Sequence, residues 1–144
     1  MLFKYIGNFR WKDVFEKPYK TNDNSFLNVK RFEIVKGKDI EFRYFEIEKG
    51  GYSSLERHEH EHIVMFIKGR GIVLIENEIY EFEPFDVVYI PSFKAHRFVA
   101  KYEDIGFICV VKKDRDKPQK LNEEEIKALI EKNPNLKEFL KFGV

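Results

Sequence analysis

Three of the four histidines of this chain alternate with other residues in one short segment. They are His58, His60 and His62, in the stretch RHEHEHIV. Residues two apart in a β-strand face the same side, so these imidazoles and the carboxylate of Glu56 would point in one direction. Imidazole is the commonest metal ligand among side chains. The spacing predicts a metal site rather than a solvated strand face or an expression tag, because the buried-looking run 63–67 follows at once.

A straight strand could not bring the outer two of these histidines to one ion. Neighbours two apart are about 6.6 Å apart along a strand, which would separate His58 from His62 by about 13 Å. Metal–nitrogen bonds of about 2.0–2.1 Å leave no room for that span. The chain must therefore bend or turn between His58 and His62. A further ligand should come from a neighbouring strand, and His96, shortly after Pro91, is the histidine that remains.

The residues around these histidines have an all-β pattern. From Asn28 to Lys112, short segments rich in Val, Ile, Phe and Tyr are separated by Gly, Pro or Asn. Many short strands with tight turns favour a small antiparallel barrel or sandwich, which removes exposed sheet edges. Turns are predicted at 36–38, 50–51, 69–71 and 77–78. The predicted strands are Val29–Val35, Ile40–Glu48, Ser54–His60, His62–Lys68, Ile72–Glu76, Ile79–Phe82, Val87–Ile90, Ala95–Ala100 and Ile105–Val111.

The two ends of the chain differ from this central pattern. Residues 1–27 show no sustained period, and we expect an arm that packs on a barrel formed by residues 28–112, with one short helical turn near Trp11–Phe15. A single domain is the default at 144 residues, a length at which folding buries roughly 68–70% of the unfolded surface.

Residues 113–144 form a C-terminal extension with a helical period. Asn122 can cap a helix, and Glu125 at the third helical position can reach back to complete a capping box. A second short helix is predicted to begin at Asn133-Pro134. The apolar stripes of both helices are expected to pack against the barrel or a second subunit.

Composition excludes several classes of partner. The chain has 26 Lys and Arg against 25 Asp and Glu, a formal charge of +1, which does not direct it to nucleic acid or an anionic membrane. No apolar run approaches the roughly 20 residues of a membrane helix, and charges follow the start too soon for a secretory signal. A cytoplasmic location is therefore expected. The abundance of Lys and Glu suggests a heat-adapted source.

The histidine pattern resembles the cupin superfamily, whose barrels hold one metal ion with ligands from two motifs. The first motif is usually Gly-x5-His-x-His, then three or four residues, Glu, six residues and Gly. With His58 and His60 as the pair, His62 takes the place of the glutamate, as in an all-histidine variant of the family. Counting forward from Gly50 instead places Glu56 and His58 at the pair, so Glu56 is a rival to His60 as a ligand.

The second cupin motif is usually Gly-x5-Pro-x-Gly-x2-His-x3-Asn. Pro91 and His96 match this motif in register. Phe85, Phe93 and Ala100 replace its two glycines and its asparagine. These departures affect the turn geometry rather than a metal ligand.

The resemblance covers roughly residues 29–111 and implies a cupin-type double-stranded β-helix, which is a jelly-roll barrel. The implied metal ligands are His58, His60, His62 and His96. Four neutral imidazoles do not cancel the charge of a divalent ion, which stays a strong Lewis acid. The candidate cofactor is one divalent transition metal ion, Fe, Cu, Ni, Zn or Mn. Cupins of this size are commonly dimers, so a homodimer is expected.

Strand parity places Phe66, Phe98 and Phe107 inward, together with Cys109, the single cysteine. Such a lining would favour an apolar or aromatic ligand, or would simply fill a small barrel. A metal-dependent oxidoreductase of dioxygenase type, acting on a small organic substrate, is the leading functional hypothesis.

Two other classes of function remain open. A cupin can bind or sense a small ligand without turnover. Isomerase or lyase action would require a general acid or base beside the ion, for which Tyr44 and Tyr89 are the candidates. The sequence does not decide whether the chain is an enzyme.

Overall fold

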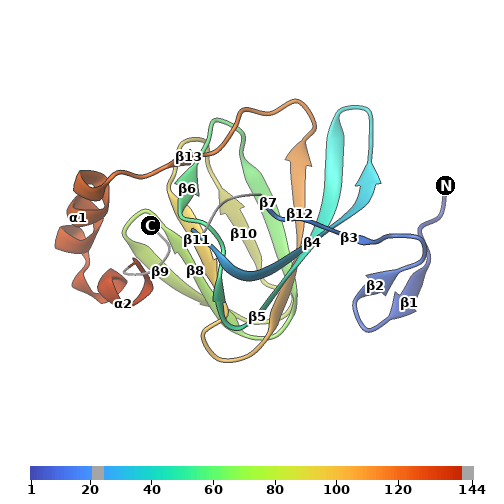
Figure 1. Cartoon of the computed structure of the whole chain (residues 1–144), viewed down its shortest axis with the longest axis horizontal. Coiled ribbons are helices and arrows are strands. Elements are labelled where there is room, and N and C mark those ends of the chain that lie inside the picture. The colour runs from blue at the N-terminus through green and yellow to red at the C-terminus, as the bar shows by residue number, and fades with distance from the viewer. Residues whose placement is uncertain (21–24, 141–144) are drawn as a thin grey trace.

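The computed structural model describes residues 1–20 and 25–140, and a curled antiparallel sheet dominates this part of the chain (Figure 1). The all-β prediction is confirmed. Residues 21–24 of the expected arm and 141–144 of the expected C-terminal extension lie outside the described residues. The strands are β1 Tyr5–Gly7, β2 Arg10–Trp11, β3 Glu16–Lys17, β4 Leu27–Lys36, β5 Ile40–Tyr52, β6 Glu56–Arg57, β7 His62–Lys68, β8 Gly71–Ile75, β9 Glu78–Phe82, β10 Val87–Ile90, β11 His96–Val99, β12 Ile105–Lys112 and β13 Gln119–Lys120.

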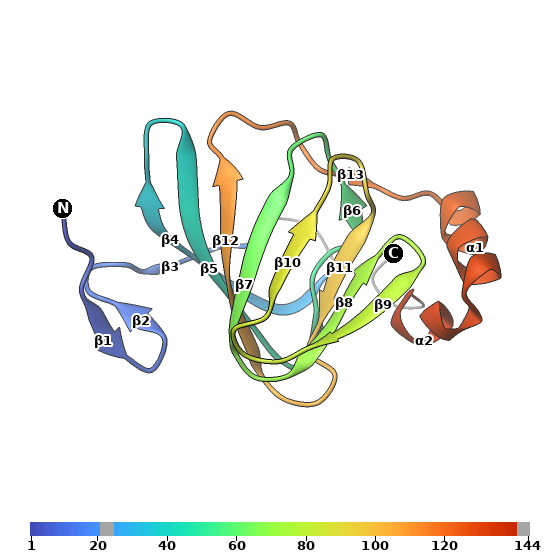
Figure 2. The same cartoon turned by 180° about the vertical axis from the view of Figure 1, so that it is seen from behind.

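The strands of the main sheet follow the order β10-β7-β12-β5-β11-β6-β13. β4 extends the sheet beyond β5, and the β8–β9 hairpin pairs with β11. Strands β5 and β12 pair over eight residues, from Ile40 opposite Lys112 to Ile47 opposite Ile105. The view from behind in Figure 2 shows the sheet curling so that β7 and β10 face the viewer while β4 and β5 wrap round the side. The curl gives the sheet an enclosed inner face.

The inner face carries an apolar core at one end of the sheet. Phe66, Phe98, Phe107 and Cys109 all lie in this core, as strand parity predicts. The rings of Phe66 and Phe82 stack with centroids 3.5 Å apart, and those of Phe98 and Phe107 with centroids 4.3 Å apart. Offset and stacked aromatic pairs of this kind add to the stabilisation from burial alone.

The outer face of the sheet is covered in part by the N-terminal hairpin β1–β2 (Figure 1). The rings of Trp11 and Tyr44 lie 5.4 Å apart, and the ring of Phe9 stacks on Tyr44 at 6.2 Å. The helical turn predicted near Trp11–Phe15 is wrong, because Trp11 belongs to β2 and pairs with Tyr5 of β1. Aromatic residues on a hairpin, rather than on a helix, cover this face.

The C-terminal helices pack on the opposite flank of the molecule, beside β8 and β9 (Figure 1). They are α1 Glu123–Lys132, a 3₁₀ turn Pro134–Leu136 and α2 Lys137–Leu140. Both predicted helix starts are confirmed, and the capping box between Asn122 and Glu125 is present. Across the residues that the structure describes, no helix is long and apolar enough to span a bilayer.

The turn predicted at Gly50-Gly51 is absent, since strand β5 continues to Tyr52. The Gly50 amide donates to the carbonyl oxygen of Ala100, and the Ala100 amide donates to that of Gly51. Gly50 has φ +89°, a conformation that favours glycine, so the strand bends here and pairs with the segment around β11. A Cβ at Gly51 would lie 2.4 Å from the carbonyl oxygen of Leu27.

Candidate metal centre

The histidine segment is bent, as the sequence requires. Strand β6 covers Glu56–Arg57 and β7 begins at His62, so only these two residues of the predicted strand Ser54–His60 are in a strand. The predicted change of direction between His58 and His62 is confirmed.

Groups from distant parts of the chain hold this bend. The carboxylate of Asp116 accepts hydrogen bonds from the backbone amides of Glu59 at 2.8 Å and His60 at 3.1 Å. The Phe93 amide donates to the carbonyl oxygen of His58 at 2.7 Å. These bonds satisfy backbone groups that a strand would have paired within a sheet, so the turn replaces the strand.

Three of the four histidines converge at this bend. One ring nitrogen from each of His58, His62 and His96 lies within 4.8 Å of the other two. The Nε2 atoms of His58 and His62 are 2.9 Å apart. Two ligands at a right angle on one ion, each about 2.1 Å from it, would be about 3.0 Å apart. The donor type and this spacing fit a transition metal ion.

The other ring nitrogens of the three histidines are already engaged. Nδ1 of His58 donates to the backbone oxygen of His60 at 2.6 Å, and Nδ1 of His96 donates to that of Lys94 at 2.9 Å. Nδ1 of His62 contacts Sγ of Cys109 at 3.1 Å. A carbonyl acceptor fixes the proton on Nδ1, which leaves the lone pair of Nε2 free for an ion.

Burial keeps these imidazoles neutral. The four histidine residues have exposed fractions of 2–7%. Burial lowers the pKa of His96 to about 4 and lowers the pKa of His62 well below its ordinary value. The pKa values of His58 and His60 are also lowered, mainly by burial. Neutral imidazole is the form that binds metal, so the site is ready to accept an ion at neutral pH.

His60 lies beside the three converging histidines. Its ring stacks on that of His58, with centroids 3.6 Å apart and planes 3° from parallel. An ion lies close to the plane of each imidazole that binds it, so two parallel stacked rings do not share one ion. Nδ1 of His60 also donates to Asp116 at 2.8 Å. Ligation by His60 stays a prediction.

Glu56, the rival ligand, is engaged elsewhere. Its carboxylate lies 2.6 Å from Nζ of Lys20 and accepts a hydrogen bond from the hydroxyl of Ser54, also at 2.6 Å. Burial raises the pKa of Glu56, but Lys20, His96 and Ser54 outweigh burial and hold it below its ordinary value. The glutamate is therefore ionised, and it lines the site without pointing to a role as a metal ligand.

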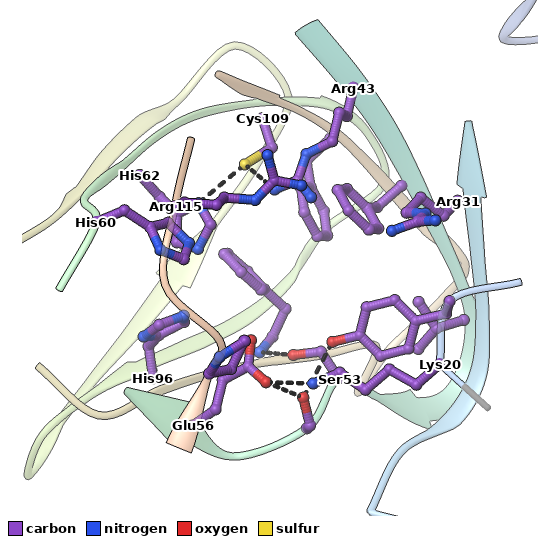
Figure 3. A pocket seen from close by; sticks show the side chains of 17 residues that line it. Lys20, Arg31, Arg43, Ser53, Glu56, His60, His62, His96, Cys109 and Arg115 are labelled. Atoms are coloured by element: carbon purple, nitrogen blue, oxygen red, sulfur yellow. Dashed lines mark hydrogen bonds and ion pairs between the residues drawn. The ribbon is translucent and has the colours of Figure 1, made fainter. Parts of the chain in front are cut away.

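A pocket of about 260 Å³ opens beside the histidines. Figure 3 shows His60, His62 and His96 on one side of this pocket and Arg31 on the other. Four cationic side chains line the pocket: Lys20, Arg31, Arg43 and Arg115. The aromatic rings among its lining residues are Tyr19, Phe45, Phe98 and Phe107. Its volume lies below the roughly 300–1,000 Å³ of drug-sized pockets, which favours a small ligand.

The cationic lining was not foreseen from the sequence, although a signal existed. The alternation that places Phe107 and Cys109 inward on β12 also places Arg43 and Phe45 inward on β5, because Arg43 lies opposite Cys109. Lys20 and Arg115 come from outside the barrel strands, and nothing in their local sequence marks them.

The two tyrosines considered as acid–base groups do not line the pocket. Tyr44 is buried on the outer face of the sheet and donates to Glu46 at 2.8 Å. Tyr89 is half exposed, and its hydroxyl donates to Glu61. Their side chains lie outside the pocket because the alternation of side chains along each strand places both on the outer face.

Comparison with known proteins shows the family to which this chain belongs. The cupin domain model matches residues 43–111. The chain is 38% identical over 129 residues to 1-methylthio-D-xylulose 5-phosphate methylsulfurylase from Rhodospirillum rubrum, an alignment that covers 87% of this chain and 83% of that relative. The chain belongs to the cupin family.

Solved structures agree with this assignment. A cupin 2 conserved barrel domain protein from Rhodopseudomonas palustris is 36% identical, with a TM-score of 0.89 over 96% of this chain and 98% of that chain. A cupin-2 domain from Rhodospirillum rubrum is 35% identical, with a TM-score of 0.85 over 96% and 95% of the two chains. The predicted cupin-type jelly-roll barrel is thus confirmed.

Proposed function

We propose that this chain is a metal-dependent enzyme that cleaves the carbon–sulfur bond of a small phosphorylated keto sugar. One observation carries the proposal: two of the three converging imidazoles line one small pocket together with the buried Arg43 and the partly buried Arg31. The relative from Rhodospirillum rubrum is named for a substrate with a methylthio group, a ketone sugar and a phosphate. A metal site beside cationic side chains suits such a molecule.

The histidines would hold the ion. His58, His62 and His96 supply the three convergent nitrogens, and we propose His60 as the fourth ligand, after rotation of its ring away from His58. A bound divalent ion supplies Lewis acidity toward a ketone oxygen. Separate His60→Ala and Glu56→Ala variants settle the fourth ligand, because the true ligand is the one whose loss weakens metal binding more.

The reaction balances with a thiol as the second substrate. In a 1-methylthio 2-ketone, a thiol sulfur attacks the methylthio sulfur, and the carbon–sulfur bond breaks. The carbon keeps the electron pair as an enolate and then takes a proton, while the methylthio group leaves as a mixed disulfide with the thiol. The ketone is required because it delocalises the electron pair.

The chain's own residues would bind the substrate and exclude water. Phe98 and Phe107 are buried and form an apolar floor on which a methylthio group can rest. Cys109 contacts His62 from behind and fixes the orientation of that ring.

The test is direct turnover. Metal-loaded protein is incubated with 1-methylthio-D-xylulose 5-phosphate and a small thiol, and mass spectrometry follows the loss of substrate and the appearance of the methylthio mixed disulfide. The double variant His58→Ala/His96→Ala serves as the inactive control. Binding of the substrate without any product would contradict the proposal and favour a ligand-binding cupin.

A dioxygenase remains a second candidate because Phe45, Phe98 and Phe107 line the pocket beside the nitrogen ligands. A dioxygenase function predicts oxygen uptake when Fe- or Cu-loaded protein is mixed with a catechol or flavonol. Oxygen uptake in that assay, together with no release of methylthio groups in the first, would replace the leading proposal.

A further inference from the structure

The four cations of the pocket differ in how they are neutralised. Nζ of Lys20 lies 2.6 Å from the carboxylate of Glu56. Arg115 lies 3.1 Å from the buried carboxylate of Glu41. Each of these two cations has an anionic partner supplied by the protein, so neither requires an anionic ligand.

Arg43 has no such partner. Its residue is 7% exposed, and no carboxylate among the described residues lies within 4.0 Å of its guanidinium. Its Nη2 donates to Sγ of Cys109 at 3.4 Å, and its guanidinium carbon lies 4.9 Å from the ring centroid of Phe45. Its buried Nε has no hydrogen-bond partner. A thiol is a weak acceptor, and an uncompensated buried charge is costly.

Arg31 supplies a second incompletely paired guanidinium group to the pocket. Its Nη2 is 3.6 Å from Glu33, which also pairs with Lys17 at 3.1 Å. Its Nε is buried without a hydrogen-bond partner. Arg31 pairs with Phe45 across β4 and β5, two residues from Arg43, so the two arginines are diagonal neighbours that line one pocket.

We propose that Arg43 and Arg31 form the subsite that binds the phosphate group of the substrate. The assignment rests on the proposed function for the identity of the substrate. Two guanidinium groups match a phosphate monoester in charge, and their N–H donors match its several oxygens. Figure 3 shows both arginines directed into the pocket.

The position of this subsite also limits the length of the substrate. Sγ of Cys109 lies between the guanidinium of Arg43 and the ring of His62, at 3.4 Å and 3.1 Å respectively. The phosphate subsite and the metal centre are therefore separated by a single side chain. A short sugar phosphate reaches both, with its ketone end at the histidines.

The first measurement is binding of inorganic phosphate by isothermal titration calorimetry, at matched metal content. Arg43→Met is expected to weaken binding about 10- to 100-fold, as removal of a charged hydrogen-bond donor does, and Arg31→Met by a smaller factor. Arg70→Met is the control, because Arg70 is exposed and lies outside the pocket, over the ring of Tyr102. Unchanged phosphate binding in both pocket variants would overturn the subsite.

The second measurement compares sugars with and without phosphate. In Arg43→Met, kcat/KM is expected to fall about 10- to 100-fold more for the phosphorylated methylthio sugar than for its unphosphorylated counterpart. Equal losses on both sugars would overturn the assignment. Titration with acetate separates phosphate from a carboxylate as ligand, and tighter binding of acetate than of phosphate would also overturn it.

The two proposals can fail separately. Phosphate binding that depends on Arg43, in a protein without carbon–sulfur cleavage, supports the subsite and refutes the reaction. Circular dichroism melting and metal content verify that each variant folds. Arg43→Lys keeps the positive charge but loses the planar guanidinium group with its paired N–H donors. It is therefore a milder variant, with an expected loss of about 10-fold in phosphate affinity.

Discussion

The two ends of the barrel interior are built from the same strands and differ in chemistry. On β7, His62 at the pocket end is followed on the same face by Val64 and Phe66. On β12, Cys109 at the pocket end is preceded by Phe107. Strand β11 shows the same change from polar to apolar residues, since His96 lies in the pocket and Phe98 reaches into the core.

The difference shows how one sheet supports both a stable core and a reactive site. The core end holds the stacked rings of Phe66 and Phe82 and supplies burial that stabilises the fold. The pocket end carries buried polar groups, which are individually costly unless they are paired or bind a ligand. Changes at the core end should therefore alter stability, and changes at the pocket end should alter binding.

The largest expected effect is at the pocket end. Replacing His58 and His96 together by alanine removes two of the three convergent nitrogens, and we expect metal binding to be abolished. Elemental analysis of untagged protein measures the metal content. Retention of one ion per chain in the double variant would break the distinction between the two ends.

At the core end, Phe66→Ala is expected to lower the free energy of unfolding by about 3–5 kcal/mol, because it leaves a cavity against the stacked ring of Phe82. Chemical denaturation measures the change. Phe85→Ala is the matched control, since Phe85 is 74% exposed. Metal content should be normal in both variants, and a loss of metal in Phe66→Ala alone would mean that the ends are coupled.

The pocket end should also make stability depend on pH. The pKa of His96 is about 4 in the folded chain, against an ordinary value of 6.5. Between these values the unfolded chain binds more protons, so the stability of metal-free protein falls as the pH drops from about 6.5 to 4, by about 2–3 kcal/mol for this histidine. Denaturation at a series of pH values measures the slope. His96→Gln should show a shallower slope, and an equal slope would assign the effect to other groups.

The smallest expected effect comes from the segment that holds the histidine bend. Asp116→Ala removes the acceptor for the amides of Glu59 and His60, and we expect metal affinity to fall about 10-fold. Competition with a chromophoric chelator measures the affinity. Asp114→Ala, at an exposed neighbouring position, is the control. Equal affinities for the two variants would show that the bend forms without Asp116.

Much of the fold follows from local patterns. The predicted strands His62–Lys68 and Val87–Ile90 have the bounds of β7 and β10, because alternation and flanking turns specify a half-buried strand. Only Glu56–Arg57 of the predicted strand Ser54–His60 is in a strand. Beyond Arg57, backbone amides donate hydrogen bonds to Asp116, far along the chain, and these bonds stabilise a turn. The turn at Gly50-Gly51 was wrong because pairing with Ala100 keeps the glycines in the strand.

By itself, the sequence determined the kinds of metal ligand and the need for a bend, because imidazole chemistry and the rise per residue of a strand are local properties. Tertiary structure decided that His58, His62 and His96 converge while His60 stacks aside. It also decided which pocket cations are neutralised, because the partner carboxylates come from other segments. Pairing and burial of charge depend on which distant side chains meet, and no single segment of the chain encodes that.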